Sequence, residues 1–594
     1  MTDIRKPDSR AVLREPRSDK WLDFTSPCRI LTTRRIDEVL PLMRQVDKAV
    51  EREGLYAVGF ISYEAAPAFD ACLPSKGEGE CPLLWFGLFR RVNEMATLPK
   101  GRGANLPVSW QPSVTQDEYR RCLRSIHRYI RDGDTYQVNF TYRLRVQTQV
   151  DPWDFFAELV GNDHTPYASF VDTGQWAVCS ASPELFLRLE GEQIESHPMK
   201  GTAARGLWLE DDCAKAAALR ASKKDRAENL MIVDMVRNDL GRVAVSGSVH
   251  VPSLFDVERY PTVWQMTSTV RARTRAPLVQ ILQAAFPPAS ITGAPKRRTM
   301  EIIVELESSP RHVYTGIIGF VAPGRRAQFS VAIRTVLIQS ASGQAEYGVG
   351  GGIVWDSRPA AEQKECLVKT RVLSPLRRDF DLFETMLWSP RSGYWLLEYH
   401  LKRLAQSAEY FGFHVDLCRI REELAGIAAG LPLGCHRIRL VVSRHGAFRC
   451  EATAVESGSM RFGDISLAKT PVDAGDVFLY HKTTHRLVYL NAVRMHPGNE
   501  DVLLFNEAGE ITESTVANVA VEIDGVLCTP PLRCGLLPGT HRAWLLDRGD
   551  VRESVVTFEQ ALRAPAVYLL NSVRGIHRVK IISSEKPSSL NQRM

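Results

Sequence analysis

The hydrophobic positions of the chain alternate between helical and strand periodicity over most of the first 375 residues. Residues 115–118 form a capping-box pattern, and apolar side chains then recur at helical spacing until Gly133, which predicts one helix. Directly afterwards apolar and polar residues alternate, as in a strand with one buried face, with the apolar positions at Val138, Phe140, Tyr142, Leu144 and Val146. This change of period predicts a mixed helix and sheet fold.

The same reasoning predicts the other elements of this part of the chain. Strand-like runs cover residues 57–70, 82–90, 176–189, 315–321 and 328–338, the last of which carries Arg334. A hairpin at residues 190–192 directs its return strand toward Lys200. Helical patterns cover residues 223–240 and 297–306, with a loop over residues 287–296. Glu362, Glu365 and Lys369 are spaced three and four apart, so one helical face presents all three side chains.

A second pattern begins after a linker at residues 371–378, which contains Ser374-Pro375. Strands are predicted at 380–388, 437–442 and 478–479, a helix at 398–411 and another after Gly539-Thr540. Asp524-Gly525 between alternating runs indicates a hairpin. The fold class is therefore α+β with two domains, residues 1–375 and 376–594.

Composition narrows the possible functions. The chain has 594 residues, enough for two to four domains, and a net charge of +6 from 75 basic and 69 acidic residues. This slight excess does not indicate nucleic-acid binding. A signal peptide and a membrane span are not apparent, so the expected location is the cytoplasm, with no membrane partner. The 12 cysteines are scattered without a CxxC pair, which gives no sign of a disulfide framework or a zinc site.

One group of chemically interesting residues lies in the first domain. Several carboxylates on separate predicted helices, Arg334 and the glycine-rich run Gly348–Gly352 suit an anionic substrate held through a divalent cation. Each member also has an ordinary interpretation, since Glu365 and Lys369 could form a surface pair. Lys200, between Pro198 and Gly201, could equally be a solvated loop residue.

Seven motifs in this domain resemble the chorismate-utilising enzymes, in the order in which that family has them. The family includes anthranilate synthase, component I of aminodeoxychorismate synthase, and the isochorismate and salicylate synthases. The resemblance covers about residues 20–375 and implies a sandwich of antiparallel sheets with flanking helices. The motifs span residues 133–139, 182–184, 199–202, 224–234, 237–241, 291–296 and 351–354.

The residue at position 200 distinguishes members of this family. The resemblance implies that a lysine here attacks C2 of chorismate as the C4 hydroxyl leaves, and that ammonia then adds at C4 and expels the lysine; anthranilate synthases have alanine instead. The same resemblance implies Mg²⁺ ligation by Glu228 and Glu365 and acid/base chemistry by Glu184. It also implies substrate binding by Arg334, Thr292, Gly351 and Gly352.

Two departures from the family pattern and one absence qualify this resemblance. Met199 replaces the usual isoleucine, a change that conserves volume, and Trp264 stands where many relatives have a histidine near the leaving group. The group that delivers a proton there is therefore unassigned. A glutaminase signature is not apparent, so ammonia is expected from a separate glutamine amidotransferase subunit or from ammonium salts.

A second group of residues in the C-terminal domain suits pyridoxal phosphate. This cofactor needs a Schiff-base lysine, a carboxylate beside the pyridine nitrogen and donors for its phosphate. The candidates are Lys482, Glu513, Arg403, Gly539 and Thr540. The motifs at residues 383–385, 399–403, 481–483, 511–518 and 537–540 resemble the fold-type IV pyridoxal-phosphate enzymes over about residues 379–582.

Because the C-terminal domain is fused to a domain that resembles a synthase, we expect it to act on the product of that synthase. A fold-type IV lyase that consumes 4-amino-4-deoxychorismate would release pyruvate and form 4-aminobenzoate, with Lys482 removing the C4 proton. Homodimerisation through this domain is also implied by its relatives. The alternatives are an aminotransferase with another substrate, an anthranilate-type product, or a scaffold that only binds the amidotransferase. Leu487 argues against a branched-chain aminotransferase, which has tyrosine at that position.

Overall fold

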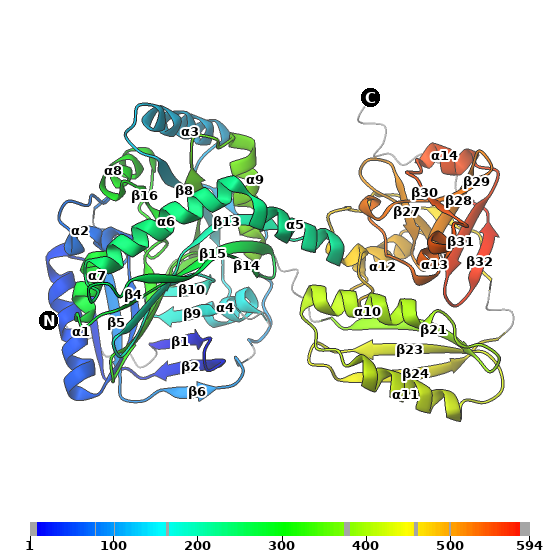
Figure 1. The fold of residues 1–594 in the computed structure, drawn as a ribbon, viewed down its shortest axis with the longest axis horizontal. Helices are drawn as coiled ribbons and strands as arrows, with labels where there is room; N and C mark the ends of the chain where they lie inside the picture. The colour runs from blue at the N-terminus through cyan, green and yellow to red at the C-terminus, as the bar shows by residue number, and fades with distance from the viewer. Residues whose placement is uncertain are drawn as a thin grey trace. The chain divides into compact units, whose positions relative to one another are not determined.

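A computed structural model describes residues 9–77, 79–99, 101–161, 165–373, 380–456, 461–497 and 501–582. Most of the predicted linker, including Ser374-Pro375, lies outside these ranges. The chain divides into two compact units (Figure 1). Unit 1 comprises Met1–Arg205 and Lys215–Arg377, and unit 2 comprises Gly206–Ala214 and Arg378–Met594. The helices in the described ranges lack the combination of length and hydropathy that crossing a membrane requires.

Two antiparallel sheets, each of ten described strands, form the centre of unit 1. The first has the order β16 (Gly293–Ala294), β8 (Gln137–Gln147), β20 (Gln344–Ile353), β19 (Thr335–Gln339), β10 (Trp176–Ser182), β9 (Tyr167–Asp172), β1 (Arg10–Glu15), β2 (Lys20–Thr25) and β6 (Asn93–Met95), with β7 (Gln111–Pro112) beside β8. The second has the order β13 (Met199–Ala204), β15 (Val263–Arg273), β12 (Gln193–His197), β11 (Leu185–Glu190), β18 (Arg326–Val331), β17 (Ile317–Ala322), β4 (Tyr56–Ile61), β5 (Leu84–Phe89) and β3 (Arg29–Thr33), with β14 (His250–Arg259) beside β15.

Apolar side chains from both sheets form the core of the sandwich. Leu13 and Phe24 of the first sheet pack with Phe60 and Phe320 of the second, and all four are buried. Helices cover the outer faces (Figure 1). The second sheet contacts α1 (Ile36–Glu53) and α7 (Leu278–Ala285), and the first contacts α4 (Pro152–Val160). These contacts confirm the predicted sandwich of antiparallel sheets with flanking helices.

Two helices that carry candidate site residues pack near β13 and β20. Helix α6 (Lys223–Gly241) contacts β13 and β15, and α9 (Pro359–Thr370) contacts β20. Helices α3 (Gln116–Arg131) and α8 (Lys296–Leu306) pack against β8. The predicted helices at 223–240 and 297–306 and the capping box at Thr115 are confirmed.

The predicted strand at 328–338 is wrong at Arg334. Strand β18 ends at Val331, before this residue, and β19 begins at Thr335, directly after it. The φ of Arg334 is +50°. A positive φ belongs to the left-handed region, which a residue with a Cβ rarely adopts and which breaks the pleat of a strand. Hydrophobic alternation does not reveal such a break because the apolar side chains continue on both sides.

Within its described residues, unit 2 contains three sheets. They have the orders β22 (Gly393–Tyr394), β21 (Leu382–Ser389), β23 (His436–Val442), β24 (Phe448–Ala454); β25 (Ser466–Leu467), β26 (Val502–Phe505), β27 (Ile511–Ser514); and β30 (Arg552–Glu553), β29 (Val526–Thr529), β28 (Asn518–Ile523), β31 (Val567–Asn571), β32 (Gly575–Val579). The described helices are α10 (Leu397–Phe411), α11 (Leu417–Gly430), α12 (Leu487–Arg494), α13 (Thr540–Arg548) and α14 (Phe558–Arg563), and the start of α5 (Leu209–Ala221) also belongs here.

Most predictions for this unit are confirmed, including the hairpin at Asp524-Gly525, which joins β28 to β29. The predicted strand at 478–479 is wrong, because Val477–Leu479 is a 3-10 turn that Asp476 caps by accepting a hydrogen bond from the main-chain N–H of Phe478. Two apolar residues are too short a run to distinguish a strand from a buried turn.

Candidate active sites

Lys200 lies on β13 with its side chain 11% exposed. Its Nζ is 4.0 Å from Glu228 Oε2 on α6, and a Cβ added to Gly352 of β20 would lie only 2.2 Å from that Nζ. The amine therefore lies directly against the bare Gly352 backbone. Burial lowers the pKa of Lys200, an effect that Glu228 opposes and Lys369 reinforces. A lysine with these neighbours is closer to its neutral, nucleophilic form than a surface lysine.

Three carboxylates and three lysines surround this point. Glu228 lies within ion-pairing distance of Lys200 and of Lys224, at 4.0 and 3.8 Å; Lys224 is also 4.0 Å from Glu362, and Lys369 is 2.7 Å from Glu365. The predicted common helical face is confirmed, because α9 carries Glu362, Glu365 and Lys369, and a Cβ added to Gly351 would lie 3.4–3.9 Å from atoms of all three.

The donor set at this cluster suits Mg²⁺ but does not form a complete cage. In the part of the chain that the structure describes, no three His, Cys, Asp or Glu side chains are arranged to hold a metal ion. Mg²⁺ commonly binds through one or two protein carboxylates, with the remaining ligands from substrate and water. Three carboxylates lie close together here, and a cation would offset part of their charge and that of an anionic substrate.

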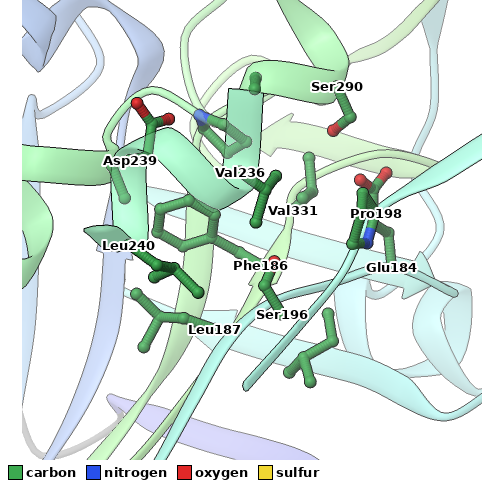
Figure 2. Close-up of a pocket in the computed structure, with 14 residues that line it drawn as sticks. Glu184, Phe186, Leu187, Ser196, Pro198, Val236, Asp239, Leu240, Ser290 and Val331 are labelled. Atoms are coloured by element: carbon green, nitrogen blue, oxygen red, sulfur yellow. The ribbon is translucent and has the colours of Figure 1, made fainter. Parts of the chain in front are cut away.

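Glu184 is buried directly after β10, at the turn into β11. Burial raises its pKa to about 7, although the Ser290 hydroxyl, the Met199 N–H and the charges of Lys200 and Arg334 lower it. A cavity of about 20 Å³ lies beside Glu184 and Ser290 and extends toward Asp239 (Figure 2). This volume holds about one water molecule and is too small for a ring-sized substrate.

Arg334 and Thr292 have different surroundings. The Arg334 guanidinium lies 5.6 Å from the centre of the Tyr260 ring and close enough to Glu184 to lower the pKa of that carboxyl. Backbone strain at such a residue is typical of binding sites. Thr292 is fully buried, and its hydroxyl donates to the main-chain carbonyls of Ala289 and Pro288 at 3.2 and 3.4 Å. The hydroxyl thus holds its own loop together.

Gln137 is a candidate site residue that the sequence reasoning missed. Its side chain is buried, and neither amide atom has a hydrogen-bond partner within the described structure. A Cβ added to Gly352 would lie 1.9 Å from Gln137 Nε2 and 2.2 Å from Lys200 Nζ, so the amide and the amine are neighbours. Buried polar atoms without partners are uncommon and point to a bound group. The available signal was its place in the motif at residues 133–139.

Trp264 lies on β15 opposite Ala203 of β13, four residues after Tyr260. The guanidinium carbon of Arg205 lies 5.4 Å from its ring centre, a cation–π arrangement. An indole has no group that can deliver a proton to a leaving hydroxyl at ordinary pH. Among the candidate residues around Lys200, Glu184 is a carboxyl whose pKa is close to neutrality.

In unit 2, Lys482 lies three residues after the 3-10 turn Val477–Leu479, and a main-chain hydrogen bond fixes its position. Its carbonyl accepts a hydrogen bond from Phe383 N at 3.0 Å, and its Nζ lies 4.7 Å from the centre of the Phe383 ring. Burial and the charge of Arg403 lower the pKa of Lys482 to about 7, while Glu384 opposes the shift. Near neutral pH a substantial fraction of this amine is unprotonated.

Segment 206–214 supports the residues that precede Lys482. The Leu207 carbonyl lies 3.1 Å from His481 Nε2, so that nitrogen carries the hydrogen. Ser407 Oγ is 3.0 Å from the other ring nitrogen, and the Tyr410 hydroxyl donates to Gly206 O at 2.6 Å. Trp208 stacks on Tyr480 at 5.4 Å. Sequence reasoning placed this segment in the first domain.

The candidate phosphate-binding residues are close together. Arg403 on α10 donates to both oxygens of Glu384 at 2.9 and 2.6 Å and to the Pro538 carbonyl at 3.1 Å. Burial opposes ionisation of Glu384, but Arg403 and His400 hold its pKa down at about 2. Gly539 caps α13, whose first residue, Thr540, has its hydroxyl 3.4 Å from His400 Nε2. A helix N-terminus beside an arginine suits a phosphate group.

Glu513 on β27 is positioned by three donors. The Tyr489 hydroxyl and the Leu537 N–H donate to one oxygen at 2.7 and 3.1 Å, and Asn518 Nδ2 donates to the other at 3.1 Å. Burial nevertheless raises the pKa of Glu513 to about 7. A fixed carboxyl that ionises beside a positive group suits the protonated ring nitrogen of pyridoxal phosphate. The residues present therefore fit this cofactor.

Comparisons with known families match both parts of the chain. Residues 9–375 match the family described as chorismate binding enzyme, and residues 381–582 match amino-transferase class IV. The crystal structure of anthranilate synthase component I from Streptococcus pneumoniae superposes with a TM-score of 0.52 and 22% identity, covering 63% of this chain and 94% of that chain. This likeness shows the fold of the first part.

Two curated relatives resemble the chorismate-binding part. Over 274 residues the chain is 43% identical to aminodeoxychorismate synthase component 1 of Salmonella typhimurium, covering 46% of this chain and 60% of that protein. Over 285 residues it is 44% identical to aminodeoxychorismate synthase of Streptomyces pristinaespiralis, covering 47% of this chain and 39% of that protein. The chain thus spans less than two thirds of either relative.

Proposed function

This chain belongs to the chorismate binding enzyme family through residues 9–375, and we propose that it converts chorismate into 4-aminobenzoate in two reactions. Unit 1 replaces the C4 hydroxyl of chorismate with an amino group, and unit 2 eliminates pyruvate from the resulting 4-amino-4-deoxychorismate. The observation that carries the proposal is the buried Lys200 amine, which lies against Gly352 between the carboxylates of α6 and α9. The names of the two curated relatives support the same reaction.

Lys200 acts as the nucleophile in the first reaction. The Lys200 nitrogen forms a bond to C2, the two conjugated ring double bonds shift toward C4, and the C4–oxygen bond breaks. Ammonia then forms a bond to C4, both double bonds shift back and the C2–nitrogen bond breaks, which returns Lys200 as its amine takes up the proton that the added ammonia loses. Glu184 gives the departing hydroxyl its proton, so water leaves, since burial keeps part of this carboxyl protonated near pH 7.

The remaining unit 1 residues hold the substrate. Arg334 and the backbone of Gly351 and Gly352 bind a carboxylate, and Thr292 supports the adjoining loop. Glu228 and Glu365 would hold Mg²⁺, with Glu362 nearby, and the ion would offset the negative charge of the substrate. Gln137 offers an NH₂ group that donates and a carbonyl oxygen that accepts beside Lys200.

In unit 2, pyridoxal phosphate would withdraw electrons from the amino-bearing carbon of its substrate. Arg403, Gly539 and Thr540 would hold the phosphate, and Glu513 would keep the ring nitrogen protonated. Lys482 removes the C4 proton of the substrate, because its lowered pKa leaves an unprotonated amine near neutral pH. Loss of pyruvate then leaves an aromatic ring.

Ammonia comes from a separate glutamine amidotransferase subunit, and unit 2 forms a homodimer. These partners are proposed from the family resemblance. The twelve cysteines are all free thiols, which suits the reducing cytoplasm as the location. Because the separate subunit supplies the ammonia, we expect turnover with glutamine only when that subunit is added. Ammonium salts should support turnover without it.

Product identification tests the proposal. The full chain is incubated with chorismate, ammonium, Mg²⁺ and pyridoxal phosphate, and products are separated by chromatography and identified by mass. We expect 4-aminobenzoate from the wild type and 4-amino-4-deoxychorismate from Lys482→Ala. Accumulation of the intermediate by the cofactor-loaded wild type would contradict the lyase reaction and favour an aminotransferase, which the class IV match also covers. Formation of anthranilate would contradict the first reaction.

A further inference from the structure

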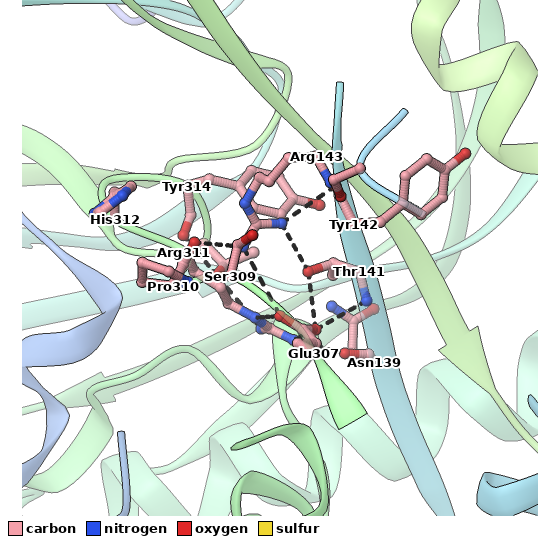
Figure 3. Close-up of polar contacts among 12 residues, drawn as sticks. Asn139, Thr141, Tyr142, Arg143, Glu307, Ser309, Pro310, Arg311, His312 and Tyr314 are labelled. Carbon is pink, nitrogen blue, oxygen red and sulfur yellow. Dashed lines mark hydrogen bonds and ion pairs between the residues drawn. The ribbon is translucent and has the colours of Figure 1, made fainter. Parts of the chain in front are cut away.

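Arg311 is a fully hydrogen-bonded guanidinium at the point where several segments of unit 1 meet (Figure 3). Its side chain is 1% exposed. Nε and Nη2 donate to the two oxygens of Glu307 at 3.0 and 2.6 Å. Nη2 also donates to the Asn139 carbonyl at 2.7 Å, and Nη1 donates to the Ile291 carbonyl at 2.9 Å and to Thr315 Oγ1 at 3.4 Å. All five N–H groups are thus used.

The two carbonyls belong to segments that reach the proposed active site. Asn139 lies on β8 two residues after Gln137, whose amide adjoins Lys200. Ile291 ends the 3-10 turn Ala289–Ile291, which contains Ser290; this residue lines the same cavity as Glu184, and its hydroxyl lowers the pKa of that carboxyl. Asn139 Nδ2 also donates to Ile291 O at 3.0 Å, so the two segments share a junction.

We propose that Arg311 is a positioning residue for the chorismate reaction, because its forked guanidinium fixes the main chain beside Gln137 and beside Ser290 at once. Only a planar group with several fixed donors can bind Glu307 and both carbonyls together. The inference rests on the proposed function of unit 1, and nothing in it requires Arg311 to touch substrate. According to this inference, the buried Arg311–Glu307 pair helps to set the geometry of the active site, a role that the sequence motifs did not indicate.

Arg143 provides a matched comparison within the same network. It lies 3.8 Å from Glu307 and is equally buried. Its hydrogen bonds go to Thr141 Oγ1 and to the carbonyls of Tyr142 and Pro310, and its Nε pairs with Glu346 Oε1 at 3.6 Å. Arg143 therefore shares the carboxylate but has no hydrogen bond to the Ser290 turn.

The test compares Arg311→Lys with Arg143→Lys in the full chain. Lysine keeps the charge beside Glu307 but cannot reach both carbonyls. We expect Arg311→Lys to lower kcat for chorismate by roughly 10–100-fold, in line with the sensitivity of catalysis to small displacements. We expect Arg143→Lys to lower thermal stability with less than about 3-fold change in kcat, since it leaves the turn in place.

The pH profile separates positioning from general destabilisation. Glu184 faces Lys200 and Arg334, with Asp239 across the cavity, and Ser290 lowers its pKa. Loosening the Ser290 turn therefore raises the pKa of Glu184. The alkaline limb of the kcat profile should move to higher pH in Arg311→Lys and in Ser290→Ala, and stay in place in Arg143→Lys. Added guanidinium should restore part of the kcat of Arg311→Ala.

An Arg311→Lys enzyme with wild-type kcat and an unmoved alkaline limb would overturn the inference. If Arg311→Lys does not fold, an unmoved limb in Ser290→Ala would overturn it instead, because the effect is transmitted through that turn. Failure of the proposed function is distinguishable, since the wild-type chain would then show no turnover of chorismate at all.

Discussion

Lys200 shows how opposing physical effects at one residue decide the chemistry. Burial disfavours its charged form, while Glu228 and Glu365 favour it, and the net effect is a lowered pKa. An alanine at this position leaves the carboxylates and glycines unchanged but removes the only group proposed to attack C2. In the proposed reaction the identity of the product therefore depends on one side chain, and burial lowers the pKa of its amine.

Replacing Lys200 with alanine should lower formation of 4-amino-4-deoxychorismate by at least about 100-fold, because the covalent route is lost. Residual turnover is expected to give anthranilate, which needs no lysine adduct. Chromatography of the products measures both outcomes. Undiminished aminodeoxychorismate formation would show that Lys200 has no covalent role.

Glu184 should make the stability of unit 1 depend on pH. Its folded pKa of about 7 lies above the ordinary value of 4.5, so the folded chain retains a proton that the unfolded chain loses. The free energy of unfolding therefore falls as pH rises from about 4.5 to 7, by ~3 kcal/mol. Denaturant titrations at pH 5 and pH 8 should show a smaller decrease for Glu184→Gln, and an equal decrease in both proteins would disprove this assignment.

Lys482→Ala should remove the visible absorbance that pyridoxal phosphate acquires when it is bound covalently. Lys469→Ala serves as a control, since Lys469 is an exposed lysine of the same unit. An unchanged spectrum in Lys482→Ala would mean that another lysine binds the cofactor.

At the scale of single elements, β20 matters because a glycine on it leaves room for two side chains from other strands. Gly352 leaves space for the Lys200 amine and the Gln137 amide, whereas Gly351 is only in ordinary contact with the α9 side chains. Neither glycine has a positive φ, so space and not backbone strain decides what fits there. The backbone of β20 thus lines one side of the candidate site.

Gly352→Ala should therefore displace Lys200 and lower chorismate turnover by about 100-fold or more. Gly351→Ala is the matched control, and it should lose less than about 10-fold because its Cβ meets Glu362 Oε2 at 3.4 Å. Steady-state kinetics of both variants, together with circular dichroism to confirm folding, measure the difference. Equal losses in the two variants would argue against close packing at Gly352.

The sequence predicts elements whose periodicity is local. The helix α6 and the strand β8 follow from apolar spacing, and the face of α9 follows from the three- and four-residue spacing of its charged side chains. Arg334 and the turn before Lys482 were misassigned, because a left-handed residue and a 3-10 turn leave no mark on that spacing. Most site residues came from motif resemblance.

Contacts between distant segments could not be predicted in the same way. Gln137 adjoins Lys200 because β8 pairs with β20, a pairing set by the order of strands in the sheet. Arg311 joins β8 to a buried turn through main-chain carbonyls, which have no signature in the side-chain sequence. Segment 206–214 likewise belongs to unit 2 only through tertiary contacts.

At the scale of the whole molecule, one chain carries two sites whose proposed reactions share an intermediate. Each site has a buried lysine with a lowered pKa, and each has its own carboxylates and anion-binding groups. Variants should therefore separate the two reactions. Lys200→Ala should still convert added 4-amino-4-deoxychorismate, and Lys482→Ala should produce it without consuming it. Loss of both reactions in either variant would contradict independent sites.

The most direct test of the central claim follows atoms from substrate to product. The wild-type chain is supplied with chorismate and ¹⁵N-ammonium, and 4-aminobenzoate and pyruvate are quantified by mass spectrometry. The account predicts equal amounts of the two products, with the label in the amino group of 4-aminobenzoate. Labelled anthranilate as the product, or 4-aminobenzoate without the label, would contradict it.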